Sequence, residues 1–200
     1  VRADELALSF DERRWRVPTQ LYLARLFVAR GEPARAEGVL HRIDPRALAL
    51  HAAPVRAIHD EYRGSVQLAR GDAESALASF DRAEAELVRA GVVSYERAEL
   101  DLRRAEALTS VQRFDEADAV CARGLGAIES TGQWLELGHL LGVRARISEA
   151  RGRPAEAREH RDQAERVLRR TGDRFELARC LLDRARSEFE AADRRRLSVA

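Results

Sequence analysis

Gly152-Arg-Pro-Ala-Glu-Ala157 combines the signals of a turn with those of a helix start. Glycine suits the turn, and proline suits the first helical residues, where its missing N–H removes no hydrogen bond. Related stretches begin at Gly31, at Gly71 and, without the glycine, at Gln112, so the four copies follow one another at a nearly constant interval. A constant period of about 40 residues is typical of helical repeat proteins.

A second kind of turn recurs with the same period. Thr131-Gly132 is matched one period later by Thr171-Gly172, and glycine at such a position commonly ends a helix. Asp173 followed by Glu176 is typical of a capping box at the start of the next helix. Between the two kinds of turn, apolar residues recur every three or four positions, which is the period of an α-helix. No segment alternates as a strand does, so the sequence predicts an all-α fold of paired antiparallel helices.

These turns divide the chain into about five helical units within a single domain, residues 1–200. The approximate bounds of the units are 17–53, 54–93, 94–133, 134–173 and 174–200. We expect Pro18 in the first turn of a helix, an irregular connection near 46–53, and the end of the last full helix near Ala191. Because the sequence does not begin with methionine and its last unit is incomplete, we expect an array that is truncated, and exposes apolar surface, at both ends.

The composition argues against several classes of partner. The chain has 35 basic residues, all of them arginine, 34 acidic residues and a formal net charge of +1. It therefore has no overall field that would attract nucleic acid or an anionic membrane. No apolar segment approaches the roughly 20 residues of a membrane span, and no signal peptide is evident. We expect a cytoplasmic protein in which Cys121 and Cys180 are unbridged core residues.

Each unit carries a small residue at a fixed place in each of its two helices. These residues are Ala24, Gly64, Ala105, Ala145 and Ala185 in the first helices, and Ala36, Ala76, Ala117 and Ala157 in the second. The pattern resembles the tetratricopeptide repeat, in which small residues let paired helices approach closely. The resemblance covers nearly the whole chain and implies a right-handed helical solenoid. The period is longer than the usual value of about 34 residues, which implies longer helices, and Arg161 stands where a large apolar residue is expected.

Long, degenerate, arginine-rich units of this kind resemble the solenoid domains of bacterial signalling regulators, such as the large LuxR-type activators related to the maltose regulator MalT. The resemblance implies a scaffolding domain within a larger cytoplasmic signalling or transcription-regulatory protein, which binds a protein, a peptide or another domain of its parent chain. The alternative is an effector-sensing domain that binds a small molecule or short peptide and changes its superhelical shape. An open, charged groove would favour the scaffold, and an enclosed pocket would favour the sensor.

The chain lacks the patterns of common catalytic and cofactor sites. Without lysine it cannot form a phosphate-binding loop. Gly124-Leu-Gly126 is part of a dinucleotide-binding fingerprint, but Glu129 stands at the place of the third glycine and no strand precedes it. The five histidines never take metal-ligand spacing with another histidine or a cysteine. We therefore predict a protein that is not an enzyme and that holds no cofactor or metal.

Four arginines recur with the period of the turns, each directly before the small residue of a first helix. They are Arg63, Arg104, Arg144 and Arg184. One interpretation is structural: each side chain lays its stem on apolar neighbours and pairs with a nearby carboxylate. The other is an anion-binding ladder, a row of donors for an anionic ligand or an acidic peptide.

In helical solenoids the first helices line the concave face, which is the usual binding surface. The repeat places eight charged residues there: Arg25, Glu61, Glu99, Glu106, His139, Arg146, Glu149 and Arg186. The middle of this face would be acidic and its ends basic. A partner-binding groove is one reading of the face, and a merely solvated surface is the alternative. An acidic centre argues against nucleic acid, which requires a basic track.

Overall fold

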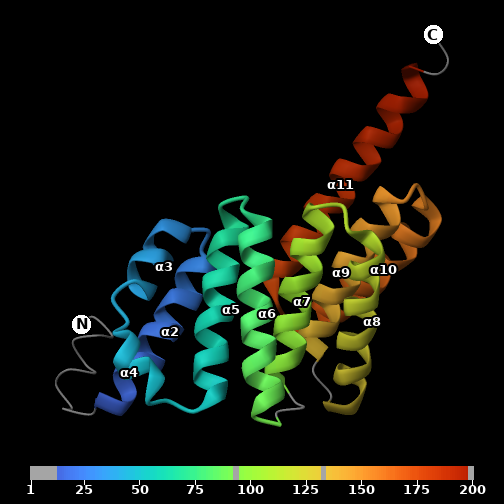
Figure 1. Cartoon of the computed structure of the whole chain (residues 1–200). Coiled ribbons are helices and arrows are strands. Elements are labelled where there is room, and N and C mark those ends of the chain that lie inside the picture. The colour runs from blue at the N-terminus through green and yellow to red at the C-terminus, as the bar shows by residue number, and fades with distance from the viewer. Residues whose placement is uncertain (1–12, 92–94, 132–133, 198–200) are drawn as a thin grey trace.

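A computed structural model describes residues 13–91, 95–131 and 134–197. Across these residues the chain forms ten α-helices and no strands (Figure 1), so the predicted all-α class is confirmed. The spacing of Leu6 and Phe10 also predicts a helix over residues 1–14, most of which lie outside the described residues. The helices are α2 (Arg13–Ala29), α3 (Pro33–Leu40), α4 (Pro45–Ala49), α5 (Ala53–Ala69), α6 (Ala73–Arg89), α7 (Tyr95–Ser110), α8 (Phe114–Thr131), α9 (Trp134–Ala150), α10 (Pro154–Thr171) and α11 (Arg174–Leu197).

Consecutive helices pack as antiparallel pairs. The most extensive contacts join α5 with α6, α7 with α8, and α9 with α10, and α2 packs in the same way on α3. The first helices of successive pairs also touch one another, α2 with α5, α5 with α7, and α7 with α9. The buried side chains form one large cluster from α5 to α9, with smaller clusters beneath α2–α5 and α9–α11. The core is therefore a strip that follows the chain from pair to pair.

The turn inside each pair has the same backbone conformation in all four copies. Its first residue lies in the left-handed region, with φ of 70° at Gly31, 84° at Gly71, 62° at Gln112 and 70° at Gly152. The N–H of that residue donates to the carbonyl oxygen three residues earlier, and the next N–H donates to the one five residues earlier. Gln112 adopts this conformation despite its Cβ. The repeat in the sequence is therefore also a repeat of the backbone.

Small residues lie where the paired helices approach each other. The alanines at the predicted positions are almost completely buried at Ala24, Ala36, Ala76, Ala105, Ala117, Ala145 and Ala157. At Gly64 a methyl group would overlap the ring of Phe80, which is itself fully buried in α6. Helices α5 and α6 are therefore closer than an alanine would allow. Ala185 is exposed, because none of the described helices covers that side of α11.

Residues 46–53, expected to be irregular, contain a short helix. Pro45 occupies the first position of α4, and the Asp44 side chain accepts a hydrogen bond from the Arg46 N–H at 2.9 Å. A proline at the first helical position preceded by an aspartate cap is a strong local start signal. The expectation was wrong because it took Asp44-Pro45 only as the end of the preceding helix.

Two other helix limits differ from the prediction. Pro18 lies inside α2 rather than in its first turn, because the helix already begins at Arg13; nearby, the Thr19 hydroxyl donates to the Trp15 carbonyl at 2.7 Å. Helix α11 continues to Leu197 without a break. Its last turns contain neither glycine nor proline, so nothing in the sequence stops the helix.

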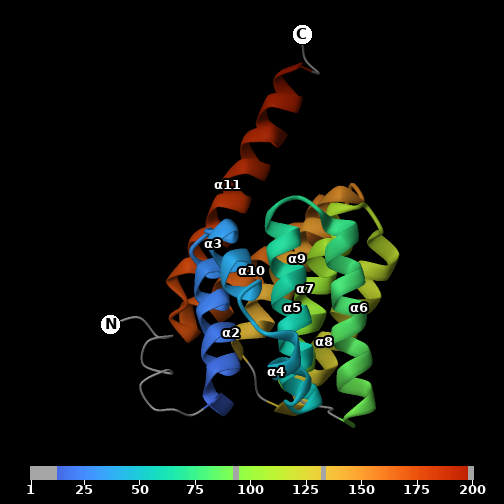
Figure 2. The ribbon, with the colours of Figure 1, turned by 60° about the vertical axis from the view of Figure 1, so that its left-hand side comes forward.

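Helix α11 differs from the other helices in how much of it is covered. Its C-terminal half projects beyond the ends of the other helices (Figure 2). Along α11 the large apolar side chains of Phe175, Leu182 and Phe189 are mostly exposed. Exposed apolar surface at the C-terminal end agrees with the sequence-based expectation.

Candidate functional site

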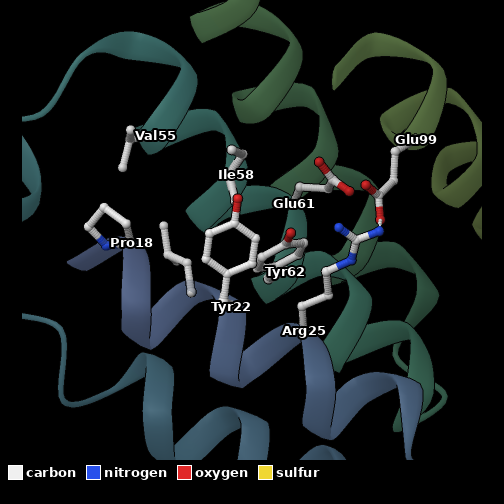
Figure 3. A pocket seen from close by; sticks show the side chains of 9 residues that line it. Pro18, Tyr22, Arg25, Val55, Ile58, Glu61, Tyr62 and Glu99 are labelled. Carbon is white, nitrogen blue, oxygen red and sulfur yellow. Dashed lines mark ion pairs between the residues drawn. The ribbon is translucent and has the colours of Figure 1, made fainter. Parts of the chain in front are cut away.

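A pocket of about 240 Å³ opens between α2, α5 and α7 (Figure 3). It is lined by apolar, aromatic and charged side chains: Pro18, Leu21, Tyr22, Arg25, Val55, Ile58, Glu61, Tyr62 and Glu99. Three of the eight residues that the sequence places on the inner face, Arg25, Glu61 and Glu99, therefore meet at one concave site. They come from three different first helices.

Helical spacing explains why these residues share the pocket. On α2, Pro18, Leu21, Tyr22 and Arg25 follow the i, i+3, i+4, i+7 pattern of a single helix face. The lining residues of α5 lie at positions 55, 58, 61 and 62, which also form one face. Contact between α2 and α5, and between α5 and α7, brings these faces together.

The pocket has an apolar end and a polar end. Figure 3 shows Pro18 and Val55 at one end, with the charged groups of Arg25, Glu61 and Glu99 gathered at the other. The Arg25 guanidinium Nη2 lies 3.3 Å from the Glu99 carboxylate Oε1, which links α2 to α7. The Arg25 side chain is 41% exposed, whereas that of Glu99 is only 12% exposed.

Two tyrosines complete the wall of the pocket. Tyr22 is largely exposed and Tyr62 is buried. Burial raises the pKa of Tyr62 far above its ordinary value; the Glu99 and Glu61 carboxylates raise it further, and Arg25 opposes them. The Tyr62 hydroxyl therefore stays protonated. The polar end of the pocket holds the Glu61 and Glu99 carboxylates and the Arg25 guanidinium, and Arg103 interacts electrostatically with both carboxylates.

A second cluster lies where charged side chains of α7, α9 and α11 meet. Its centre is Glu106, whose carboxylate accepts hydrogen bonds from Arg103 at 3.0 Å, Arg146 at 3.2 Å and Arg179 at 3.0 Å. Arg146 also donates to Asp183 of α11 at 3.2 Å. Burial of Glu106 opposes ionisation, but the three guanidinium groups outweigh it and lower the pKa of Glu106 to about 2. We call these five residues the Glu106 network.

Glu149 and Arg161 form a neighbouring ion pair. Arg161 is buried in α10, at the position where a large apolar residue was expected, and its guanidinium donates to the Glu149 carboxylate. The same carboxylate accepts a hydrogen bond from Ser187 of α11. The buried arginine is therefore accommodated by pairing with a carboxylate of α9, which Ser187 of α11 in turn hydrogen-bonds.

The last two predicted inner-face residues lie elsewhere. The His139 side chain is mostly buried, with Nε2 lying 3.5 Å from Asp173 and 3.9 Å from Glu176, carboxylates at the start of α11. Arg186 is exposed on α11. The eight residues thus divide between an open pocket, two ion-paired clusters beneath α11, a histidine beside the α10–α11 turn and an exposed arginine.

Sequence reasoning missed several residues at both places. Tyr22 and Tyr62 line the pocket, and Arg179 and Asp183 complete the Glu106 network. Tyr22 lies three residues before Arg25 on the same helix face, a spacing that could have identified it. Nothing in the sequence pairs Arg179 with Glu106, because that contact joins residues 73 positions apart.

Three of the four regularly spaced arginines pair with carboxylates of the helix directly before their own, which is the second helix of the preceding pair. Arg104 contacts Asp81 at 2.7 Å and also Glu84; Arg144 lies 3.6 Å from Asp118; Arg184 contacts Glu165 at 3.0 Å and also Asp162. Arg63 is exposed. These pairs join α6 to α7, α8 to α9 and α10 to α11. The anion-binding ladder stays a prediction.

Metal and thiol chemistry is not evident in the part of the chain that the structure describes. Its residues include no group of three or more histidine, cysteine or carboxylate side chains that could hold a metal ion. Cys121 and Cys180 are free and buried, as expected, and burial raises the pKa of the Cys121 thiol to about 12. None of the helices described is both long enough and apolar enough to span a membrane.

Comparison with known proteins identifies no family for this chain. No family model matches the chain, and no curated protein matches it. The tetratricopeptide-repeat resemblance therefore rests on the sequence pattern and on the recurring helix pairs.

Proposed function

We propose that this chain is a protein-interaction domain, built as a right-handed helical solenoid of the tetratricopeptide-repeat kind. It holds an extended segment of a protein partner, or of another domain of its parent chain, against the face formed by the first helices. The parent protein is a bacterial cytoplasmic regulator of signalling or transcription.

The recurring turns support the solenoid. The same left-handed turn appears at a nearly constant interval, and after each turn the next helix packs back on the previous one. A constant unit with a constant turn produces a regular stack, and stacks of this kind bind partners along their inner face.

The observation that carries the binding proposal is the pocket between α2, α5 and α7. It combines apolar walls, an exposed aromatic side chain and charged groups, the mixture that recognition sites need for affinity and orientation. Its volume of about 240 Å³ is below the roughly 300 Å³ at which pockets for drug-sized molecules begin. The pocket therefore suits one side chain of a peptide better than a complete small-molecule effector.

The second candidate function is the effector sensor, and the position of α11 favours it. Helix α11 contacts α7 and α9 through polar groups, Arg179 with Glu106, Asp183 with Arg146, and Ser187 with Glu149. Polar contacts can be exchanged for those of a ligand or water at a lower cost than apolar packing. Displacement of α11 would change the shape of the inner face.

Selection from a random peptide library tests the first proposal. Peptides selected on the wild-type protein are titrated against Tyr22→Ala and against Phe175→Ala, a matched control that removes a similarly exposed aromatic side chain from α11. We expect at least a tenfold weaker affinity for Tyr22→Ala and no change for Phe175→Ala, with unchanged circular dichroism for both. A library that yields no binder, or peptides that bind Tyr22→Ala as tightly as wild type, would contradict the proposal.

A further inference from the structure

We propose that a groove on α8, α9 and α10 binds an acidic amphipathic segment of a protein partner, in which two carboxylates flank a row of apolar side chains. The groove has a volume of about 870 Å³ and shares no described lining residue with the pocket between α2, α5 and α7. Helix α9 packs against both α8 and α10 (Figure 1). The groove is therefore a second binding surface, and it does not depend on the function proposed for the inner face.

Apolar side chains from all three helices form the floor of the groove. They are Leu125 and Ile128 of α8, Leu137 and Leu141 of α9, and Val167 of α10. All five are buried or half-buried. The groove is larger than the inner-face pocket, about 870 Å³ against about 240 Å³, so it has room for several apolar side chains of one bound segment.

Arginines supply the charge of the groove. The four that line it are Arg144, Arg166, Arg169 and Arg170, and none of the described lining residues carries a carboxylate. Arg144 lies 3.6 Å from Asp118, and the buried Nε of Arg144 has no hydrogen-bond partner among the described residues. Arg169 pairs with Glu165 at 2.7 Å. Two of the four charges are therefore at least partly met within the fold.

Arg166 and Arg170 carry the charge that the fold leaves unpaired. Both are exposed on α10, at the edge of the apolar floor. In the part of the chain that the structure describes, neither side chain forms an ion pair or a hydrogen bond. The groove therefore keeps an excess of positive charge after the pairs with Asp118 and Glu165 are taken into account.

The spacing of these two arginines fits two carboxylates of one segment. Arg166 and Arg170 are four positions apart, which is about 6 Å along the axis of α10. With Gln163 and Val167 they follow the i, i+3, i+4, i+7 pattern of a single helix face. Acidic residues one turn apart on a partner helix have the same separation, and guanidinium groups bind carboxylates by strong, charge-assisted hydrogen bonds.

Charge complementarity selects this occupant over the alternatives. A basic segment would be repelled by the arginines, and a neutral apolar segment would leave the charges of Arg166 and Arg170 unmatched. A small molecule with one carboxylate would engage one of the two arginines. An acidic amphipathic helix engages both while its apolar face covers the floor, which is a common mode of peptide recognition.

Four matched helical peptides test the groove. The first has three leucines along one face and, beside them, two glutamates four positions apart. In the second and third peptides these glutamates are replaced by glutamine or by lysine, and in the fourth the leucines are replaced by alanine. Each fluorescently labelled peptide is titrated with the complete chain, and binding is followed by fluorescence anisotropy. We expect the first peptide to bind saturably and the other three to bind at least tenfold more weakly.

Protein variants locate the binding surface. Arg166→Gln/Arg170→Gln should weaken binding of the first peptide at least tenfold, with unchanged circular dichroism. The matched control is Arg42→Gln/Arg158→Gln, which removes the same charge at exposed positions outside the described lining of the groove. It should change the affinity less than twofold. Tyr22→Ala should also have no effect, because Tyr22 lines the other pocket.

Several results would overturn the inference. These are no saturable binding of the first peptide, equally tight binding of the glutamine, lysine or alanine peptide, and binding that depends on Tyr22 or on the control arginines. Displacement of the peptide by an equal or lower concentration of decanoate would assign the groove to a small amphipathic acid instead. A dimer in sedimentation that Arg166→Gln/Arg170→Gln abolishes would assign it to a second copy of this chain.

Discussion

Two clusters of charged residues on the first helices are built around equivalent positions of the repeat and form different kinds of site. Arg25 follows the small residue Ala24, just as Arg146 follows Ala145. Arg25 pairs with Glu99 at the mouth of an open pocket, whereas Arg146 donates to both Glu106 and Asp183 beneath α11. The comparison teaches that a repeat position does not decide its own role. Where α11 packs against the first helices, the charged residues form ion pairs with it. Around Arg25, the charged residues instead line a pocket.

The largest expected effect comes from breaking the Glu106 network. Glu106→Gln leaves Arg103, Arg146 and Arg179 facing one another without the carboxylate that holds them. Removing one partner of a buried ionic cluster costs about 3 kcal/mol of unfolding free energy, which urea denaturation would measure. Glu74→Gln is the control, because Glu74 is exposed on α6, and its expected effect is below about 0.5 kcal/mol. Equal losses for the two variants would mean that the network does not stabilise the fold.

The same network predicts a dependence on acid pH. The pKa of Glu106 is lowered from 4.5 to about 2 in the folded protein, so its contribution is complete above pH 4.5 and is lost as the pH falls toward 2. That lowering corresponds to about 3 kcal/mol. We therefore expect the difference in unfolding free energy between wild type and Glu106→Gln to be greatest near neutral pH and to shrink as pH 2 is approached. A difference that stays constant from pH 7 to pH 2 would contradict the role of the charge.

Replacing one glycine by alanine in each region is expected to change stability by an intermediate amount. Gly64→Ala drives a methyl group into the ring of Phe80, and overpacking of this kind costs about 2 kcal/mol. Because Gly64 is on the same helix as Glu61 and Tyr62, displacement of α5 should also weaken peptide binding at the pocket. The control is Gly142→Ala in α9, where no atom lies within 4 Å of the added methyl; it should stabilise the protein by about 1 kcal/mol through helix propensity. Thermal denaturation of both variants measures the difference, and similar melting temperatures would refute it.

The smallest expected effect on the free energy of unfolding comes from removing the ion pair at the open pocket. Glu99→Gln removes the partner of a guanidinium that is 41% exposed, and such pairs contribute less than about 1 kcal/mol. We expect Glu99→Gln to unfold at nearly the same urea concentration as wild type while it loses affinity for selected peptides. A loss of stability as large as that of Glu106→Gln would show that the Arg25–Glu99 pair is a structural element like the Glu106 network.

Local signals account for what was predictable in the fold. The turn residues and the three-to-four spacing of apolar residues determined the ends of most helices, because both act within a few residues along the chain. The same kind of signal failed at α4, where Asp44-Pro45 both ends one helix and starts another. Within the candidate site, Arg25, Glu61 and Glu99 were predictable because the repeat assigns them to the same side of successive first helices. Their meeting with Tyr22 in a pocket was not, because it depends on the distances between three helices.

By itself, the sequence determined the all-α class, the period of the turns and the close packing at the small residues. These features follow from backbone conformation and helix geometry, which a few neighbouring residues control. Only the tertiary structure decided which charged residues of the first helices are covered by α11. The path of α11 brings Arg179 to Glu106, 73 positions away in the sequence, and leaves Glu99 at an open pocket. No local pattern encodes that choice, because it results from how the accumulated packing of all the preceding helices directs the last one.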